Sequence, residues 1–394
     1  MNNTPRAIRP HIVLLGRCNV GKSTLINALC GHEVALVSPV SGTTTDPVYK
    51  SMELLPFGPV VLVDTAGLDD ASLLGVERQR LTSRALRKAE LVLLVVAELP
   101  LLPAEQELLA DLARRQIPSI IVINTHDNTL PLIPDNAQAV NAFTGHGVSA
   151  LKDALAEKLT KVTVEPPLLN DLLHGEGVVL LVVPIDKAAP KGRLILPQVQ
   201  VLRDILDGGH RAIICRETEL VSTLHSLREP PQLVVTDSQV FGFVASTLPP
   251  DLPLTSFSII MARHKGNLPQ LTKATAALAK LNPHDKVLIS EACTHHSQED
   301  DIGRVKIPAL LRKRVGGEVS ITWQSGQTFP EELDYKLIIH CGACMITRQE
   351  MQSRLAQAEE AGIPIINYGV LLAYYNGILE RSLRPFASCI PTNA

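Results

Sequence analysis

The sequence has no apolar run long enough to cross a membrane. Its longest run, from Leu91 to Val96 and on past Glu98 to Leu102, falls well short of the roughly twenty residues that a membrane-spanning helix needs. Aromatic residues make up only 3% of the chain, whereas leucine, valine, isoleucine and alanine are abundant. That balance is typical of parallel strands covered by helices. We therefore predict an α/β protein with no membrane partner.

The sequence also lacks an excess of positive charge. The formal net charge is −3 at pH 7 and the lysines and arginines are scattered, so the basic patch of a nucleic-acid-binding protein is missing. We expect no nucleic-acid partner. The chain has seven cysteines and no sign of a secretory signal peptide, which would have a charged start and an apolar segment. We therefore predict a reduced, cytoplasmic protein. The length of 394 residues predicts two or three domains.

What the sequence does have is a phosphate-binding motif near its start. An apolar segment, His11–Leu15, runs directly into Gly16-Arg-Cys-Asn-Val-Gly-Lys-Ser23, and a helical pattern follows from Thr24 to Leu29. Strand, GxxxxGKS and helix form the P-loop arrangement, whose backbone N–H groups cradle phosphates. Lys22 is expected to reach the β- and γ-phosphates, and the Ser23 hydroxyl to bind Mg²⁺. The predicted nucleotide contacts in this segment are Gly16, Asn19, Val20, Gly21, Lys22, Ser23 and Thr24.

A second strand pattern, Val60 to Asp64, ends in an acidic residue and is followed by Thr65-Ala66-Gly67. Asp64 suits the Walker-B role on Mg²⁺, and the Gly67 N–H suits the γ-phosphate. The polar segment Ser41 to Asp46 is predicted to order over the γ-phosphate and to relax after hydrolysis.

Two further strand patterns, Leu91–Val96 and Ser119–Ile123, lead to Asn124-Thr-His-Asp127. This order of motifs resembles the Era and MnmE-like GTPases. The resemblance implies that Thr44 is the switch threonine on Mg²⁺ and that Lys22, Asn19 and Thr44 are the catalytic residues. It also implies that Asn19 helps to hold K⁺, and that the guanine base meets Asn124, Asp127 and the loop Asn141–Phe143, which contains Ala142.

The chain departs from this GTPase pattern at two positions. Thr125 stands where these GTPases have a lysine whose aliphatic stem lies along the base, which predicts weaker nucleotide binding. Leu68 stands where Ras-like enzymes have a glutamine that orients water. We therefore expect slow intrinsic GTP hydrolysis that depends on Mg²⁺ and is stimulated by K⁺.

The middle of the chain reads as a second α/β domain. A helix, Val148–Leu159, closes the first domain (1–165), and Lys161–Asn170 reads as a linker. The domain that follows (166–265) has four strand patterns and no nucleotide loop, so it is either a dimerisation module or a spacer. Its predicted strands are Gly177–Asp186, Arg211–Cys215, Gln232–Asp237 and Thr255–Met261.

The last domain (266–394) carries a split cluster of soft ligands. A strand pattern, Lys286–Ser290, leads to Cys293-Thr-His295, and another, Leu337–Ile339, leads to His340-Cys341-Gly-Ala-Cys344. Ligands at the carboxyl ends of parallel strands lie where open α/β sheets place their sites. The local pattern fits a Cys₃His zinc site and an iron–sulfur site equally well, and a redox dithiol less well. Three cysteines leave one corner of an iron–sulfur cluster open.

The three parts together resemble the HydF family, the GTPases of [FeFe]-hydrogenase maturation. The resemblance rests on Asp186 with Ala-Pro-Lys-Gly-Arg after it, on the CxH motif and on the distant HCxxC motif. It implies a [4Fe–4S] cluster on Cys293, Cys341 and Cys344. It also implies that the protein carries a diiron precursor, which is made with two radical-SAM maturases and delivered to apo-[FeFe]-hydrogenase. His295, His340 and Asp186 become candidates for an exchangeable fourth ligand. The two histidines are alternatively supporting donors, and the sequence alone favours a helix or turn cap for Asp186.

The competing interpretation is an RNA- or ribosome-associated GTPase with a zinc-stabilised tail. The acidic net charge counts against it. The sequence leaves the oligomeric state open, with a homodimer as our expectation.

Overall fold

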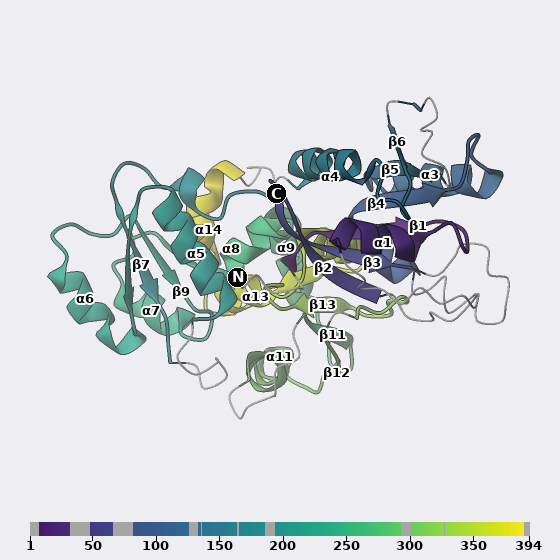
Figure 1. Cartoon of the computed structure of the whole chain (residues 1–394). Coiled ribbons are helices and arrows are strands. Elements are labelled where there is room, and N and C mark those ends of the chain that lie inside the picture. Colours follow the sequence, from purple (N-terminus) through teal and green to yellow (C-terminus); the bar gives the residue numbers. More distant parts are fainter. Residues whose placement is uncertain are drawn as a thin grey trace. The chain divides into compact units, whose positions relative to one another are not determined.

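The structure, a computed structural model, describes residues 8–31, 48–65, 82–125, 133–134, 136–163, 165–185, 194–292, 301–326 and 328–389. Its chain divides into two units, Met1–Val164 and Glu165–Ala394 (Figure 1). Some of the predicted site residues fall outside the described ranges. They are Thr44, Gly67, Asp127, Asp186, Cys293 and His295.

The first unit contains a sheet of six described strands in the order β2-β3-β1-β4-β5-β6. Neighbouring strands are parallel except for β2, which runs antiparallel to β3. The strands are β1 (His11–Leu15), β2 (Val48–Leu54), β3 (Gly58–Asp64), β4 (Ala89–Val96), β5 (Ser119–Asn124) and β6 (Ala137–Val140). Helices α1 (Lys22–Cys30), α3 (Pro103–Arg114) and α4 (Val148–Val162) cover the sheet.

Both faces of this sheet are buried. In β1, Ile12 and Leu14 belong to the core that includes Leu25 of α1 and residues of α4. The alternating residues Val13 and Leu15 belong to the opposite core, which includes residues of α3. Successive side chains of a strand point to opposite faces, so a strand covered on both sides is apolar throughout. The fold class expected from the sequence is confirmed.

The second unit begins with a parallel sheet in the order β10-β9-β7-β8. The strands are β7 (Val178–Val182), β8 (Arg211–Cys215), β9 (Leu233–Thr236) and β10 (Leu254–Ser256). The helical elements of this part are η2 (Asn170–Leu172), α5 (Leu196–Asp207), η3 (Glu217–Glu219), α6 (Leu220–Ser226), α7 (Phe241–Thr247) and α8 (Phe257–His264).

A second parallel sheet follows, in the order β12-β11-β13-β14. The strands are β11 (Lys286–Glu291), β12 (Ser320–Ser325), β13 (Leu337–His340) and β14 (Ile365–Asn367). The helical elements are α9 (Leu268–Lys273), α10 (Thr275–Leu278), η4 (Ile302–Lys306), α11 (Ile307–Val315), α12 (Arg348–Glu360), α13 (Tyr368–Tyr375), α14 (Leu379–Leu383) and η5 (Arg384–Cys389). Numbered along the chain within each sheet, both sheets have the strand order 2-1-3-4.

The two sheets of the second unit share one hydrophobic core. Helices α8 and α13 pack against each other where they begin: Asn367 Nδ2 donates to Ser258 O at 2.8 Å, and the Gly369 N–H donates to Ser258 Oγ at 3.1 Å. A Cβ at Gly369 would lie 2.8 Å from Ser258 Cβ, so only glycine allows this close approach.

One predicted strand is wrong. Thr255–Met261 was predicted as a strand, but β10 ends at Ser256 and α8 begins at Phe257. Ser256 Oγ accepts from the Ile259 N–H at 3.3 Å and so caps the helix. The residues after it are buried by helix packing rather than by strand pairing. No helix among the described residues combines the length and the apolar character that a membrane span requires.

Candidate nucleotide and metal sites

The backbone of the phosphate-binding loop takes a path that few residue types can follow. Gly21 precedes α1 with φ 89°, and a Cβ there would lie 2.2 Å from Asn124 Nδ2. Asn19 also has a positive φ of 62°. The loop therefore turns back toward the end of β5 and presents the start of α1, with Thr24 in its first turn, to a phosphate.

The basic and hydroxyl side chains of this loop bond to the loop backbone and to the end of β3. Lys22 is buried, and its Nζ donates to the carbonyls of Gly16 at 2.9 Å and Arg17 at 2.8 Å. Ser23 Oγ donates to Asp64 Oδ2 at 2.6 Å. Burial raises the pKa of Asp64, and the Ser23 hydrogen bond and the charge of Lys22 oppose that rise. Two of the three residues predicted at Mg²⁺, Ser23 and Asp64, are thus in contact.

Asn124 ties the phosphate loop to the loop after β6. Its Nδ2 donates to Val20 O at 2.9 Å, and its Oδ1 accepts from the Ala142 N–H at 3.0 Å. Thr125, which replaces the lysine of the GTPase pattern, places its Oγ1 3.3 Å from Val140 O. Of the predicted nucleotide contacts, those in the phosphate loop and α1 come together with Asp64, Asn124 and Ala142; Thr44, Gly67 and Asp127 lie outside the described residues.

In the second unit, Cys341 and Cys344 lie on a loop at the carboxyl end of β13. The Cys341 N–H donates to Ser290 O of β11 at 2.9 Å, and Cys341 Sγ accepts from the Ala292 N–H at 3.1 Å. Between the cysteines, Ala343 has φ 57°. After β11 the described chain ends at Ala292, one residue before Cys293. Cys293 and His295 are not described, and among the described residues no three metal-ligating side chains gather.

A buried lysine lies beneath this thiol loop. Lys265 is 2% exposed, and its Nζ donates to Ile346 O at 2.6 Å and lies 3.5 Å from Cys344 O. Burial raises the pKa of Cys344 to about 11 and the neighbouring Cys341 adds to the rise, whereas the charge of Lys265 opposes it. The loop thus carries two half-buried thiols, with the buried ammonium group of Lys265 bonded to its backbone.

His340 is fully buried and both of its ring nitrogens are engaged. Arg354 Nη1 lies 2.9 Å from Nε2, and Nδ1 lies 2.9 Å from Cys341 O. Because a guanidinium can only donate, Nε2 accepts and the proton is on Nδ1, which donates to the carbonyl. Arg354 also donates to Glu350 Oε1 at 2.5 Å.

Lys265, Glu350 and Arg354 were not predicted as site residues from the sequence. An available signal was the Glu350–Arg354 pair, four residues apart on the same face of α12 as the apolar Met351, Leu355 and Ala358. Charged side chains on a buried helix face require partners.

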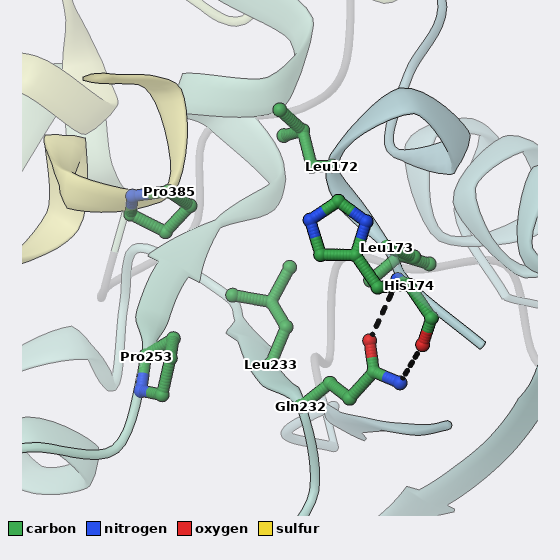
Figure 2. A pocket seen from close by; sticks show the side chains of 7 residues that line it. All are labelled: Leu172, Leu173, His174, Gln232, Leu233, Pro253 and Pro385. Carbon is green, nitrogen blue, oxygen red and sulfur yellow. Dashed lines mark hydrogen bonds between the residues drawn. The ribbon is translucent and has the colours of Figure 1, made fainter. Parts of the chain in front are cut away.

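A pocket of about 400 Å³ lies elsewhere in the second unit (Figure 2). It opens at the amino ends of β9 and β10, beside Leu233 and Pro253, and Gln232 exchanges two hydrogen bonds with the backbone of His174. Sites of open α/β sheets lie at the carboxyl ends of the strands, and none of the predicted site residues lines this pocket.

Comparison with known proteins gives matches of two kinds. The first part of the chain is similar to other GTPases. The tRNA modification GTPase MnmE of Chloroflexus aurantiacus is 40% identical over 163 residues, which are 38% of this chain and 34% of that protein. MnmE of Thermus thermophilus is 40% identical over 154 residues, 38% of this chain and 33% of that protein. GTPase Der of Pelotomaculum thermopropionicum is 34% identical over 189 residues, 44% of this chain and 41% of that protein.

The chain therefore spans only about a third to two fifths of the length of these relatives. Among solved structures, Era of Aquifex aeolicus bound to GDP and AlF₄⁻ has a TM-score of 0.35 at 19% identity and covers 52% of this chain and 92% of its own. Likeness at this level does not carry a functional argument.

Family models match all three parts of the chain. A model described as a 50S ribosome-binding GTPase matches residues 11–125. The hydrogen maturase F dimerization domain matches residues 168–266, and the hydrogen maturase F tetramerization domain matches residues 269–385. With a GTPase domain followed by both of these domains in one polypeptide, the chain belongs to the hydrogen maturase F (HydF) family.

Proposed function

We propose that the chain is a cytoplasmic GTPase that carries an iron–sulfur assembly. In this proposal Cys293, Cys341 and Cys344 hold a [4Fe–4S] cluster whose fourth corner is exchangeable. The cargo is the diiron precursor of the hydrogenase active site, received with the help of two radical-SAM maturases and passed to apo-[FeFe]-hydrogenase. The observation that carries the proposal is the pair of thiols at the carboxyl end of β13, next to the end of β11.

The residues around these thiols fit such a cluster. Thiolate is the usual ligand of iron–sulfur clusters, and hydrogen bonds to the sulfurs tune them. The Ala292 N–H already points at Cys341 Sγ. The positive charge of Lys265 beneath the loop would offset part of the negative charge that thiolates and a reduced cluster bring into a buried site.

For the fourth corner, the contacts favour a supporting role for His340. Both ring nitrogens have hydrogen-bond partners within the protein, so metal ligation would require the loss of one of them. His295 and Asp186 stay candidates for the exchangeable position. A weak fourth ligand would give way to a bridging group on the incoming diiron unit and return after its release.

We further propose that GTP acts on partner exchange and not on the cluster chemistry. Lys22, Ser23 and Asp64 provide the phosphate and Mg²⁺ contacts, and Asn19 would help to place K⁺ beside the phosphates. The γ-phosphate would order the Thr44 and Gly67 segments and so change the surface offered to partners. Cluster loading that required nucleotide turnover in the absence of every partner protein would exclude this division of roles.

The proposed homodimer has a candidate surface at β8. This strand lies at the edge of its sheet and pairs only with β7 among the described strands. Its Ile214 is 42% exposed, and Val221 of the following α6 is 50% exposed. An edge strand with exposed apolar side chains is suited to pairing with another chain.

The proposal is tested by hydrogenase activation. The reconstituted chain is incubated with the two maturases and their substrates, separated from them, and mixed with apo-[FeFe]-hydrogenase. We expect hydrogen evolution from the wild type and none from Cys341→Ser, whereas Cys215→Ser, a buried cysteine outside the motif, activates normally. Activation that survives Cys341→Ser would refute the carrier role of this site.

The alternative, a GTPase with a structural zinc tail that acts on RNA, draws on the likeness of the first domain to MnmE. It predicts stoichiometric zinc on the same cysteines and salt-sensitive binding to RNA. Metal analysis of anaerobically purified protein separates it from the carrier.

A further inference from the structure

Arg304 of η4 lies at the carboxyl end of the sheet that carries the thiol loop, and its neighbours hold its guanidinium group in place. Its Nη2 donates to the Oγ of Ser325, the last residue of β12, at 3.0 Å. Its Cζ lies 6.0 Å from the centre of the Trp323 ring, within the range of a cation–π contact. The side chain is nevertheless 40% exposed. The structure thus fixes a positive charge that water and ligands can reach.

The backbone of η4 packs closely on the same strand ends. Trp323 Nε1 donates to Gly303 O at 3.1 Å. A Cβ at Gly303 would lie 2.2 Å from Tyr368 Oη and 2.5 Å from Glu291 Oε1, so a larger residue would displace this pair. The glycine before Arg304 therefore keeps the guanidinium close to the ends of β11 and β12.

Glu291, the last residue of β11, lies between Arg304 and the thiol loop. It pairs with Ser325 on one neighbouring strand, and the N–H of the next residue donates to Cys341 Sγ at 3.1 Å. Arg304 is thus two strands away from Cys341 at the same end of the sheet, which corresponds to roughly 10 Å.

The guanidinium group keeps hydrogen-bond donors for a ligand. Its Nε lies 3.9 Å from Glu291 Oε2, which is too long for a hydrogen bond. That carboxylate accepts instead from Tyr368 Oη at 3.2 Å and from Ser325 Oγ at 3.4 Å. A guanidinium has five N–H groups, and the bond to Ser325 is the one hydrogen bond it makes with the described residues. The other N–H groups can serve an anion.

We propose that Arg304 favours anionic over neutral ligands at the exchangeable corner of the metal site, because its guanidinium donates hydrogen bonds to the anion. The proposal rests on the cluster of the proposed function. Hydrogen bonds to a charged group contribute about 10- to 150-fold in affinity. Arg304 would therefore act as a specificity residue for the group that replaces the weak fourth ligand.

A ligand titration of the full chain, reconstituted anaerobically with iron and sulfide, tests the proposal. Cyanide, an anion, and imidazole, a neutral ligand, are added to the reduced protein, and each affinity is measured from the change in EPR line shape. We expect Arg304→Gln to weaken cyanide binding about 10- to 150-fold and to leave imidazole binding unchanged. Arg304→Lys keeps the charge without the planar fork, so its cyanide affinity should be intermediate.

Arg312 of the following helix, α11, provides the matched control. It is also an exposed arginine, and its Nε donates to Glu318 Oε2 at 2.9 Å. Arg312→Gln should leave both ligand affinities unchanged. The iron and sulfide content of Arg304→Gln and its Co²⁺ affinity should match the wild type, because Arg304 bonds to no cysteine among the described residues.

Unchanged cyanide affinity in Arg304→Gln, or an equal loss for cyanide and imidazole, would overturn the proposal and make Arg304 a structural link between η4 and the strand ends. A wild-type chain that takes up no cluster, or whose EPR line shape changes with neither ligand, would instead refute the exchangeable corner, and the role of Arg304 with it.

Discussion

Arg354 Nη1 lies 2.9 Å from His340 Nε2 in the interior of the second unit, and this contact determines which nitrogen of the imidazole carries its proton. The Nδ1–H then donates to the carbonyl of Cys341. Arg354 of α12 therefore orients Cys341, the first residue of the thiol loop, through His340. Glu350 neutralises Arg354 from one helical turn away. Such partners behind a metal ligand commonly change metal affinity by about 10- to 100-fold.

Removing the arginine charge should therefore affect both folding and metal binding. Arg354→Met removes the buried arginine charge that pairs with Glu350, which we expect to cost about 3–5 kcal/mol in the free energy of unfolding and to weaken Co²⁺ binding to the cysteines about 10- to 100-fold. Urea unfolding and Co²⁺ absorption measure the two effects.

Arg203 offers the matched control, because it also pairs with a carboxylate four residues away but on an exposed helix face. Arg203→Met should change neither quantity. A stable Arg354→Met protein with unchanged Co²⁺ affinity would show that the His340 contact has no part in forming the site.

Metal binding to the thiol loop should rise with pH. Burial raises the pKa of Cys344 to about 11, so the thiol is protonated at neutral pH and must lose its proton to bind metal. Affinity should increase by up to about tenfold per pH unit for each proton released. Co²⁺ titrations between pH 6 and 9 test this, and Cys344→Ser should lower the slope while Cys215→Ser retains it.

The same shift predicts the opposite trend for the metal-free fold. A pKa raised from 9.0 to about 11 stabilises the folded state below pH 9, and that stability of about 2–3 kcal/mol is lost as pH rises toward 11. Burial also raises the pKa values of Cys30 and Cys215, so unfolding measured across this range should show a loss of stability in both proteins, and the wild type should lose about 2–3 kcal/mol more than Cys344→Ser. Equal curves would mean that the Cys344 thiol is not shielded from water in solution.

The phosphate loop should not tolerate a side chain at Gly21. Gly21→Ala combines φ 89° with a Cβ 2.2 Å from Asn124 Nδ2, so it should break the link between the loop and β5 and abolish GDP binding. Gly31 at the other end of α1 has φ 76° but open space around it. Gly31→Ala should cost about 1–2 kcal/mol of stability and preserve GDP binding.

The β8 edge gives a prediction about assembly. Ile214→Lys places a charge on an exposed edge strand, where it should oppose pairing with another chain and lower the mass measured by light scattering. Leu55→Lys, on a 73% exposed residue of the other unit, is the control and should leave the mass unchanged. A change in both variants, or in neither, would exclude β8 as the dimer surface.

Much of the fold could be predicted because most strands are buried on both faces. The strand predicted at His11–Leu15 has the same first and last residues as β1, because an apolar run followed by a glycine-rich loop has few other interpretations. The run from Thr255 to Met261 was also predicted as a strand, and only the Ser256 cap marks where the strand becomes a helix. The strands β2 and β6 are partly polar, and neither was predicted.

The thiol pair is visible in the sequence, because two cysteines with two residues between them are a local pattern, and their role as metal ligands stays a prediction. What surrounds them could not be predicted, because it depends on how distant elements pack. Lys265 reaches the thiol loop from the end of α8, far away along the chain, and Arg354 meets His340 only because α12 packs against β13. No periodicity of the sequence encodes either contact.

The measurement that tests the central claim most directly is anaerobic reconstitution with iron and sulfide, followed by EPR of the dithionite-reduced protein. We predict a [4Fe–4S] signal that is absent from Cys341→Ala and whose line shape changes when cyanide or imidazole is added, because the fourth corner exchanges. Failure to take up a cluster, together with stoichiometric zinc on the same cysteines, would contradict the account and identify the thiol loop as a structural zinc site.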